Sequence, residues 1–291
     1  AGIAKRNLLA QDWFAKEGGG LCPPFSLNRE TGMLEVKNLT KVYDDGTVAI
    51  KNVSFTVDDG EFVVIIGLSG SGKSTLLRCI NRLIDPTEGE IIWNGVHVET
   101  ATDEELRMIR RQIGMVFQHF NLVRRSPVLT NVLSGRLGYV NPWRSVLNRF
   151  SEKDRQRAME ALDRLSIADQ ARKRADELSG GQQQRVGIAR ALMQNPEMIL
   201  ADEPVASLDP VLAHSILGHL EQLNQEDGIT LLCSLHYLDL VQRYATRVIG
   251  LRDGEIVYRG NQEQIRSMTD DEFKEIYGAE AVRVGVGVGM G

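Results

Sequence analysis

Residues 61–75 read EFVVIIGLSGSGKST, and this stretch decides the fold. The apolar run at 62–66 predicts a short strand buried on both faces, and residues 73–83 have the pattern of a helix. The loop between them fits G-x-x-x-x-G-K-[ST], in which backbone N–H groups surround a phosphate. Its Lys73 reaches the β and γ oxygens, and the Ser74 hydroxyl takes a Mg²⁺ position. The stretch therefore predicts a triphosphate site formed by Gly67, Ser69, Gly70, Ser71, Gly72, Lys73, Ser74 and Thr75.

A second apolar run ends in two carboxylates. Residues 198–203 read MILADE, and Pro204 then ends the strand. If this strand is parallel to the first, both end at the same edge of the sheet, so the acids lie where the phosphate loop opens. Asp202 can hold Mg²⁺, directly or through water. Glu203 can act as general base on the attacking water if its surroundings raise its pKa toward neutrality.

The rest of the chain indicates an α/β fold with a largely parallel sheet. Apolar strands at 229–234 and 248–251 alternate with helical segments near Ala189, Leu217 and Val241. Residues 34–43 and 49–57 alternate as half-buried strands around the turn at 44–46, which predicts an antiparallel start. Residues 119–176 lack a comparable strand pattern and carry helix signals, notably Ser151 before a segment that reaches Leu165. We interpret them as a helical insert.

The ends of the chain depart from this pattern. Glycine and proline clusters at 18–20 and 23–24 break any periodicity, so residues 1–32 are interpreted as an N-terminal extension. Residues 33–278 then form one domain. Residues 279–291 include Val or Met alternating with Gly, which buries little apolar surface, and we expect a flexible tail there.

Composition excludes several classes of protein. The 291 residues are 42% hydrophobic and 25% charged, which is typical of globular chains. The longest apolar run, 62–66, is far shorter than the about 20 residues that cross a bilayer. The N-terminal residues lack the apolar core of an export signal, which favours the cytoplasm. Three widely spaced cysteines, Cys22, Cys79 and Cys233, predict reduced thiols rather than disulfides or a zinc site.

Residues 178–182 read LSGGQ, and beside the phosphate loop and the acid pair this resembles the signature of ABC-type ATPases. The resemblance covers about residues 34–278. It implies a P-loop NTPase fold with a RecA-like core, an antiparallel β subdomain and a helical subdomain. It also implies roles for Tyr43 as the adenine-stacking aromatic, Gln118 in the glutamine loop as a further Mg²⁺ ligand, Asp209 in the D-loop at 207–209, and His236 as the switch histidine.

The resemblance further implies a site shared between two copies. Ser179, Gly180, Gly181 and Gln182 begin a helix whose N-terminal N–H groups can face an anion. In the family this helix completes the nucleotide site of a second subunit, so that two chains bury two ATP head to tail. By the same resemblance His236 holds the γ-phosphate and the water in register with Glu203. The chain is then expected to be inactive as a monomer.

The resemblance extends to a task in transport. With one phosphate loop and no membrane-spanning run, the nearest family role is the motor subunit of an importer, joined to transmembrane permease subunits and indirectly to a solute-binding protein. Residues 116–123, 129–133, 202–210 and 251–254 are similar to ATPase subunits of phosphonate importers, of which phosphite importers are close relatives. Leu68 stands where that family commonly has proline. Import of polar amino acids or another small solute is the alternative. The implied location is the cytoplasmic face of the inner membrane.

One region is strongly basic. Residues 107–174 hold 15 Lys and Arg against 5 Asp and Glu, although the whole chain has a net charge of −5. We hypothesise that Arg124, Arg125 and Arg136 favour docking on acidic loops of the membrane partner or near anionic lipid. A solvated helix face is the equally weighted alternative.

Functions of other classes are less well supported. DNA-repair and chromosome ATPases share the signature, but they usually carry coiled coils or zinc modules, and the sequence has neither heptads nor cysteine pairs. A ribosome-associated ATPase normally has two phosphate loops in one chain. If the chain were a small-molecule kinase, the glycine signature and His236 would have no role. No nucleic-acid partner is expected.

Overall fold

Two β-sheets organise the chain in this computed structural model, which describes residues 33–139, 150–278, 281–284 and 287–290. The predicted extension at 1–32 lies outside these ranges. The central sheet has the strand order β10 (Glu255–Asn261), β9 (Arg247–Arg252), β3 (Phe62–Ile66), β8 (Thr230–Ser234), β7 (Met198–Ala201) and β6 (Ile113–Val116). Strands β9 to β6 are parallel, and β10 pairs antiparallel with β9. The predicted α/β fold with a largely parallel sheet is confirmed.

The central sheet is buried on both faces, as the unbroken apolar run at 62–66 predicts. Phe62, Val64 and Ile66 belong to one core and Val63 and Ile65 to the other. The first core also contains residues of the helices α4 (Val128–Leu133), α6 (Glu152–Arg164), α7 (Gly180–Leu192), α8 (Pro210–Asp227) and α9 (Leu238–Tyr244). The second core contains residues of α2 (Lys73–Ile80), α3 (Asp103–Gln112) and the second sheet.

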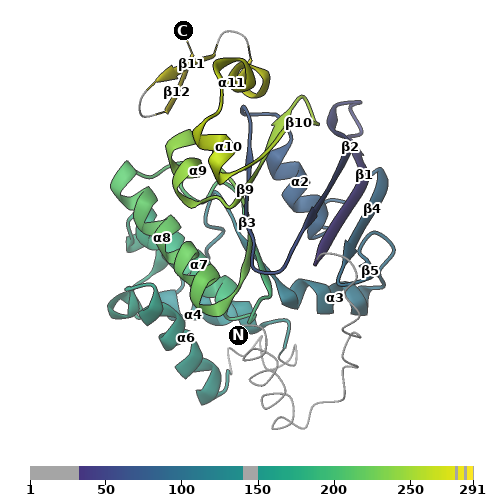
Figure 1. Cartoon of the computed structure of the whole chain (residues 1–291). Coiled ribbons are helices and arrows are strands. Elements are labelled where there is room, and N and C mark those ends of the chain that lie inside the picture. The colour runs from purple at the N-terminus through teal and green to yellow at the C-terminus, as the bar shows by residue number, and fades with distance from the viewer. Residues whose placement is uncertain (1–32, 140–149, 279–280, 285–286, 291) are drawn as a thin grey trace.

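The second sheet is antiparallel and has the order β2 (Val48–Val57), β1 (Leu34–Val42), β4 (Glu88–Trp93) and β5 (Val96–His97). Leu34 pairs with both Val57 and Trp93, so β1 lies in the middle. The predicted antiparallel start of the chain is confirmed. Figure 1 shows this sheet beside the central one, with α2 lying between them.

Helix α2 ends earlier than predicted, at Ile80 rather than residue 83. Arg82 adopts a φ of 46°, and the N–H groups of Leu83 and Ile84 both donate to the carbonyl of Arg78. A left-handed residue followed by such bonds closes a helix, although it is usually glycine or asparagine. The Arg82 guanidinium donates to the carbonyl oxygens of Val98 and Ala101, which fixes this unusual turn.

The described part of residues 119–176 contains helices joined by turns and irregular segments, and its β pairing is an isolated bridge between Pro127 and Arg174. Ser151 caps α6, where its hydroxyl accepts the N–H of Asp154, so the predicted helix start is confirmed. Short turns of 3-10 helix complete the region: η1 (Ser134–Arg136), η2 (Ala168–Gln170) and η3 (Ala175–Glu177). Helix α7 packs on both α4 and α6, which joins the insert to the core.

The C-terminal part contains α10 (Gln262–Arg266), α11 (Asp270–Tyr277), β11 (Ala281–Val284) and β12 (Gly287–Met290). Within the predicted flexible tail, β11 and β12 pair as an antiparallel hairpin. Alternating valine and glycine is compatible with such pairing. The flexibility of this segment stays a prediction. None of the helices in the described ranges has the length and apolar composition that a bilayer crossing needs.

Candidate nucleotide and metal site

The phosphate loop lies between β3 and α2, as predicted, and it depends on glycine. A Cβ on Gly67 would lie 2.1 Å from the carbonyl oxygen of Leu251, and one on Gly72 would lie 2.3 Å from that of Ala49. Gly72 has a φ of 102° and is the residue from which α2 begins. Only glycine tolerates both the close backbone approach and this conformation.

Two polar groups face inward in this loop. Lys73 is 3% exposed, and its ammonium donates to the carbonyl oxygens of Gly67 and Leu68 at 2.9 and 2.8 Å. Burial lowers the pKa of Lys73 to about 8, while the charges of Glu203 and Asp202 oppose this shift. The Ser71 hydroxyl is buried and has no hydrogen-bond partner among the described residues. An orphaned hydroxyl and a desolvated cation fit a loop that takes an anionic phosphate.

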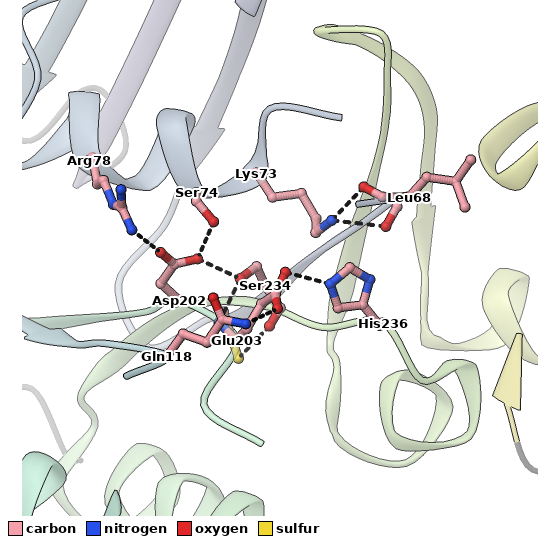
Figure 2. A network of polar contacts seen from close by, with 11 residues as sticks. Leu68, Lys73, Ser74, Arg78, Gln118, Asp202, Glu203, Ser234 and His236 are labelled. Atoms are coloured by element: carbon pink, nitrogen blue, oxygen red, sulfur yellow. Dashed lines mark hydrogen bonds and ion pairs between the residues drawn. The ribbon is translucent and has the colours of Figure 1, made fainter. Parts of the chain in front are cut away.

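Asp202 is fully buried and is held by three side chains (Figure 2). The Ser74 hydroxyl donates to Asp202 Oδ1 at 2.7 Å, and Ser234 donates to the same oxygen at 3.3 Å. Arg78 forms an ion pair with Oδ2 at 3.3 Å. The prediction that the phosphate loop and the second strand's acid share one edge of the sheet is confirmed.

Glu203 lies beside Asp202 but faces other partners. Gln118 Nε2 donates to Glu203 Oε2 at 3.0 Å, and His236 Nε2 is in hydrogen-bond contact with Oε1. Glu203 has a φ of 46°, so its backbone occupies the left-handed region that most side chains avoid. Gln118 and His236, which are far apart in the sequence, thus meet at the Glu203 carboxylate.

We expected the surroundings of Glu203 to raise its pKa toward neutrality, and this prediction is wrong for this chain. The hydrogen bond with His236 lowers the pKa of Glu203 from its ordinary 4.5, and the charges of His236 and Lys73 act in the same direction. Burial alone raises that pKa, but it is the smaller effect. The carboxylate is therefore ionised at neutral pH, so it can accept a proton without a raised pKa.

The donor set fits Mg²⁺. Magnesium prefers oxygen ligands and usually takes one or two carboxylates together with substrate phosphates. The Ser74 hydroxyl and the Asp202 carboxylate supply such oxygens side by side, and the described residues contain no group of three or more His, Cys, Asp or Glu that could form a protein-only site. Gln118 was predicted as a further ligand, but its amide nitrogen is directed at Glu203.

Tyr43 follows β1 and is accessible for stacking. It is 38% exposed, and its hydroxyl is 3.2 Å from that of Thr75 at the start of α2. The Lys41 ammonium lies 5.4 Å from the centre of the ring. An exposed ring tethered to the end of the phosphate loop is suitable for stacking on a base, as the resemblance implies.

The signature residues form a capped helix start, as predicted. Ser179 caps α7 and accepts the N–H of Gln182, whose side chain in turn accepts the N–H of Ser179 at 3.0 Å. Gly180 is exposed, whereas Gly181 packs so closely on Leu212 that a Cβ would lie 3.2 Å from it. Asp209 is exposed and caps α8 by accepting two backbone N–H groups. The two hydrogen bonds between Ser179 and Gln182 are thus local to the start of α7.

The hypothesis for the basic region needs one correction. Arg136 is 6% exposed and forms an ion pair with buried Asp154 at 3.1 Å, and its guanidinium stacks on Tyr139. It therefore stabilises the helical region from inside and is not a surface contact. Arg124 and Arg125 are exposed and remain candidates for docking.

Sequence reasoning missed Arg78 and Ser234 at this site. Arg78 is four residues after Ser74 on α2, so helical periodicity places both on one face, and this signal could have been used. Ser234 ends β8, and its position beside Asp202 depends on β8 being the neighbour of β7, which no local pattern indicates.

Known proteins are similar to this chain over most of its length. The ABC transporter family model matches residues 50–206. A "Phosphonates import ATP-binding protein PhnC" of Staphylococcus aureus strain USA300 is 56% identical over 245 residues, which are 84% of this chain and 94% of that protein. Its counterpart in strain MRSA252 is 55% identical with the same coverage.

Solved structures agree with this similarity. A dimeric post-hydrolysis state of the ATP-binding cassette MJ0796, bound to ADP and Pi, has a TM-score of 0.71 and 40% identity, covering 79% of this chain and 99% of that one. The ADP conformation of the cassette MJ1267 has a TM-score of 0.74 and 31% identity, covering 84% and 98%. The family match, the identity and the architecture concur, so this chain belongs to the ABC transporter family.

Proposed function

We propose that the chain is the ATP-hydrolysing subunit of an importer for phosphonates or closely related phosphorus oxyanions. The observation that carries the proposal is how the two neighbouring acids are held. Asp202 is hydrogen-bonded to Ser74 of the phosphate loop, and Glu203 is hydrogen-bonded to both Gln118 and His236. This arrangement unites a place for a triphosphate and its cation with an ionised carboxylate that can receive a proton.

The loop residues 67–75 would hold the phosphates of ATP, with Tyr43 stacked on the adenine. Ser74 and Asp202 would hold Mg²⁺, and Gln118 would be a further ligand once its amide oxygen turns toward the ion. The ion would neutralise charge on the phosphates. Glu203 accepts the proton of the attacking water, and His236 orients that carboxylate. The fixed left-handed backbone of Glu203 keeps the proton acceptor beside the loop.

We further propose that two copies sandwich ATP. The start of α7 is exposed at Ser179 and Gly180, so its backbone N–H groups are accessible to a phosphate held by a second copy. Asp209, exposed at the start of α8, would link the two sites. The dimeric form of the similar cassette MJ0796 supports this arrangement.

The proposed partners are transmembrane permease subunits and, through them, a solute-binding protein. The 56% identity to a phosphonate importer's ATP-binding protein over 84% of the chain supports this substrate class. The chain would then lie at the cytoplasmic face of the inner membrane, bound to the permease. Phosphite is chemically close, and polar amino acids are the competing solute class.

Reconstitution tests the proposal. The chain, its permease and its solute-binding protein are placed in proteoliposomes, and ATP hydrolysis is measured with methylphosphonate, phosphite or glutamine. We expect stimulation by methylphosphonate and uptake of it into the lumen. Stimulation by glutamine alone would contradict the substrate class, and hydrolysis that no solute changes would contradict the importer assignment.

A further inference from the structure

The hydroxyl of Ser234 connects the two acids of the site (Figure 2). Its oxygen accepts the backbone N–H of Glu203 at 2.8 Å, and it donates to Asp202 Oδ1 at 3.3 Å. Ser234 is fully buried, so solvent water does not compete for either of these two hydrogen bonds. A hydroxyl has one proton to donate, and here that proton is committed to the carboxylate while a lone pair receives the peptide.

This bridge lies where regular sheet pairing stops. The last paired residues of β7 and β8 are Ala201 and Cys233, and Ser234 bonds to the two residues that follow Ala201. On its other side, Ser234 still pairs with Ile65 of β3, next to the phosphate loop. The side chain thus extends the attachment between β7 and β8 by one residue, at the point where the chain turns into the site.

The bridge also acts on an unusual backbone conformation. Glu203 has a φ of 46°, which a residue other than glycine keeps only when its surroundings hold it there. The N–H of Glu203 belongs to the peptide that sets this turn, and Ser234 is its acceptor. In this conformation the Glu203 carboxylate contacts both Gln118 and His236. Loss of the acceptor would free the peptide to rotate and move the carboxylate away from them.

We propose that Ser234 is a positioning residue for ATP hydrolysis: its hydroxyl fixes the left-handed turn at Glu203 and aligns the proton acceptor with the cation-holding Asp202. The inference rests on the proposed function, because it needs Glu203 to act on water. Asp202 keeps Ser74 and Arg78 when the hydroxyl is lost, so nucleotide and Mg²⁺ affinity depend little on Ser234. The effect therefore falls on turnover rather than binding.

A matched pair of variants tests this role. Ser234→Thr and Ser234→Val have nearly the same shape, and only threonine keeps the hydroxyl. We expect Ser234→Val to lower kcat at least about tenfold, because small displacements of a reacting group are costly, with KM for ATP and the Mg²⁺ dependence within about twofold of wild type. Ser234→Thr should recover most of the rate. Ser234→Ala serves the same purpose if the larger side chains prevent folding.

Thr230→Val is the control for a lost buried hydroxyl. Thr230 lies at the other end of β8, is fully buried, and accepts the N–H of Gly60 at 2.9 Å, away from the acids. This variant should keep the wild-type kcat per folded molecule. Equal rates for Ser234→Thr and Ser234→Val, whether both normal or both reduced, would overturn the positioning role. Normal turnover by Glu203→Gln would instead reject the proposed base, which keeps the two failures distinguishable.

Discussion

Ser74 and Arg78 bind opposite oxygens of the same carboxylate, that of Asp202, from one face of helix α2. Asp202 is fully buried, so its charge needs a partner inside the protein. Arg78 provides the opposite charge through its ion pair with Asp202, and the Arg78 side chain is 43% exposed. The helix that follows the phosphate loop therefore also carries the counter-charge of Asp202, the residue immediately after β7.

Replacing Arg78 by alanine should destabilise the nucleotide-free protein. It leaves the buried Asp202 carboxylate with hydroxyl donors only, and since Arg78 is partly exposed we expect a loss of about 1 kcal/mol in the free energy of unfolding. Urea titration measures this. Arg78→Lys keeps the charge and should lose less. If both variants unfold at the wild-type midpoint, the ion pair contributes nothing to stability.

Glu203→Gln should bind ATP and fail to hydrolyse it. The amide keeps the shape and the contact with Gln118, but it cannot take a proton from water, so we expect turnover to fall by about 10²-fold or more. Gel filtration with ATP should then show a dimer that wild type forms only briefly. Wild-type turnover in this variant would remove Glu203 from the mechanism.

ATP affinity should decrease as pH rises above about 8, the pKa to which burial lowers Lys73. A bound phosphate favours the charged ammonium, so above this pH binding must take up a proton, and the affinity can fall by up to about tenfold per pH unit. Binding of a fluorescent ATP analogue between pH 7 and 10 measures this. Lys73→Met should bind weakly and without this pH dependence, and an equally flat wild-type profile would contradict the depressed pKa.

The same depressed pKa predicts how the stability of the free protein changes with pH. Unfolded Lys73 stays protonated up to its ordinary 10.5, whereas the folded residue loses its proton near 8. The unfolded state therefore binds more protons between these values, and the contribution of Lys73 to stability rises with pH across this window. Urea midpoints of wild type relative to Lys73→Met should show this rise.

The arginines of the basic region should separate into two kinds. Arg136→Ala leaves Asp154 buried without its partner and should cost about 3 kcal/mol of stability. Arg124→Glu with Arg125→Glu, at exposed positions, should leave stability within about 0.5 kcal/mol of wild type. The double variant should instead bind less to vesicles that contain the permease, with a weaker salt dependence. Unchanged recruitment would identify these arginines as an ordinary solvated surface.

Much of the fold could be predicted because local patterns reported it. The uninterrupted run at 62–66 belongs to a strand buried on both faces, and Ser151 is a strong helix cap. Strand β6 gave no such signal. Its Gly114 packs closely on α7, since a Cβ there would lie 3.2 Å from that of Ala191. Because glycine is uncommon in strands, a glycine that allows a helix to pack closely also weakens the local sequence pattern of its strand.

The site was predictable where a motif fixes adjacent residues and less so where strand order decides. The phosphate loop and the acids at 202–203 were placed correctly relative to each other. The low pKa of Glu203 was not foreseen, because it depends on a hydrogen bond with His236 across the site. Ser234 was missed for the same reason, and Arg136 was assigned to the surface because charge alone does not reveal a buried partner.

Mixing two inactive variants tests the shared site most directly. Lys73→Ala lacks the phosphate-binding lysine but keeps the start of α7, whereas Ser179→Arg blocks that start but keeps the loop. If ATP lies between two copies, a mixed dimer contains one complete site, so the mixture should regain ATP hydrolysis that neither variant shows alone. A mixture as inactive as its components, or full hydrolysis by isolated single copies of the wild-type chain, would contradict the account.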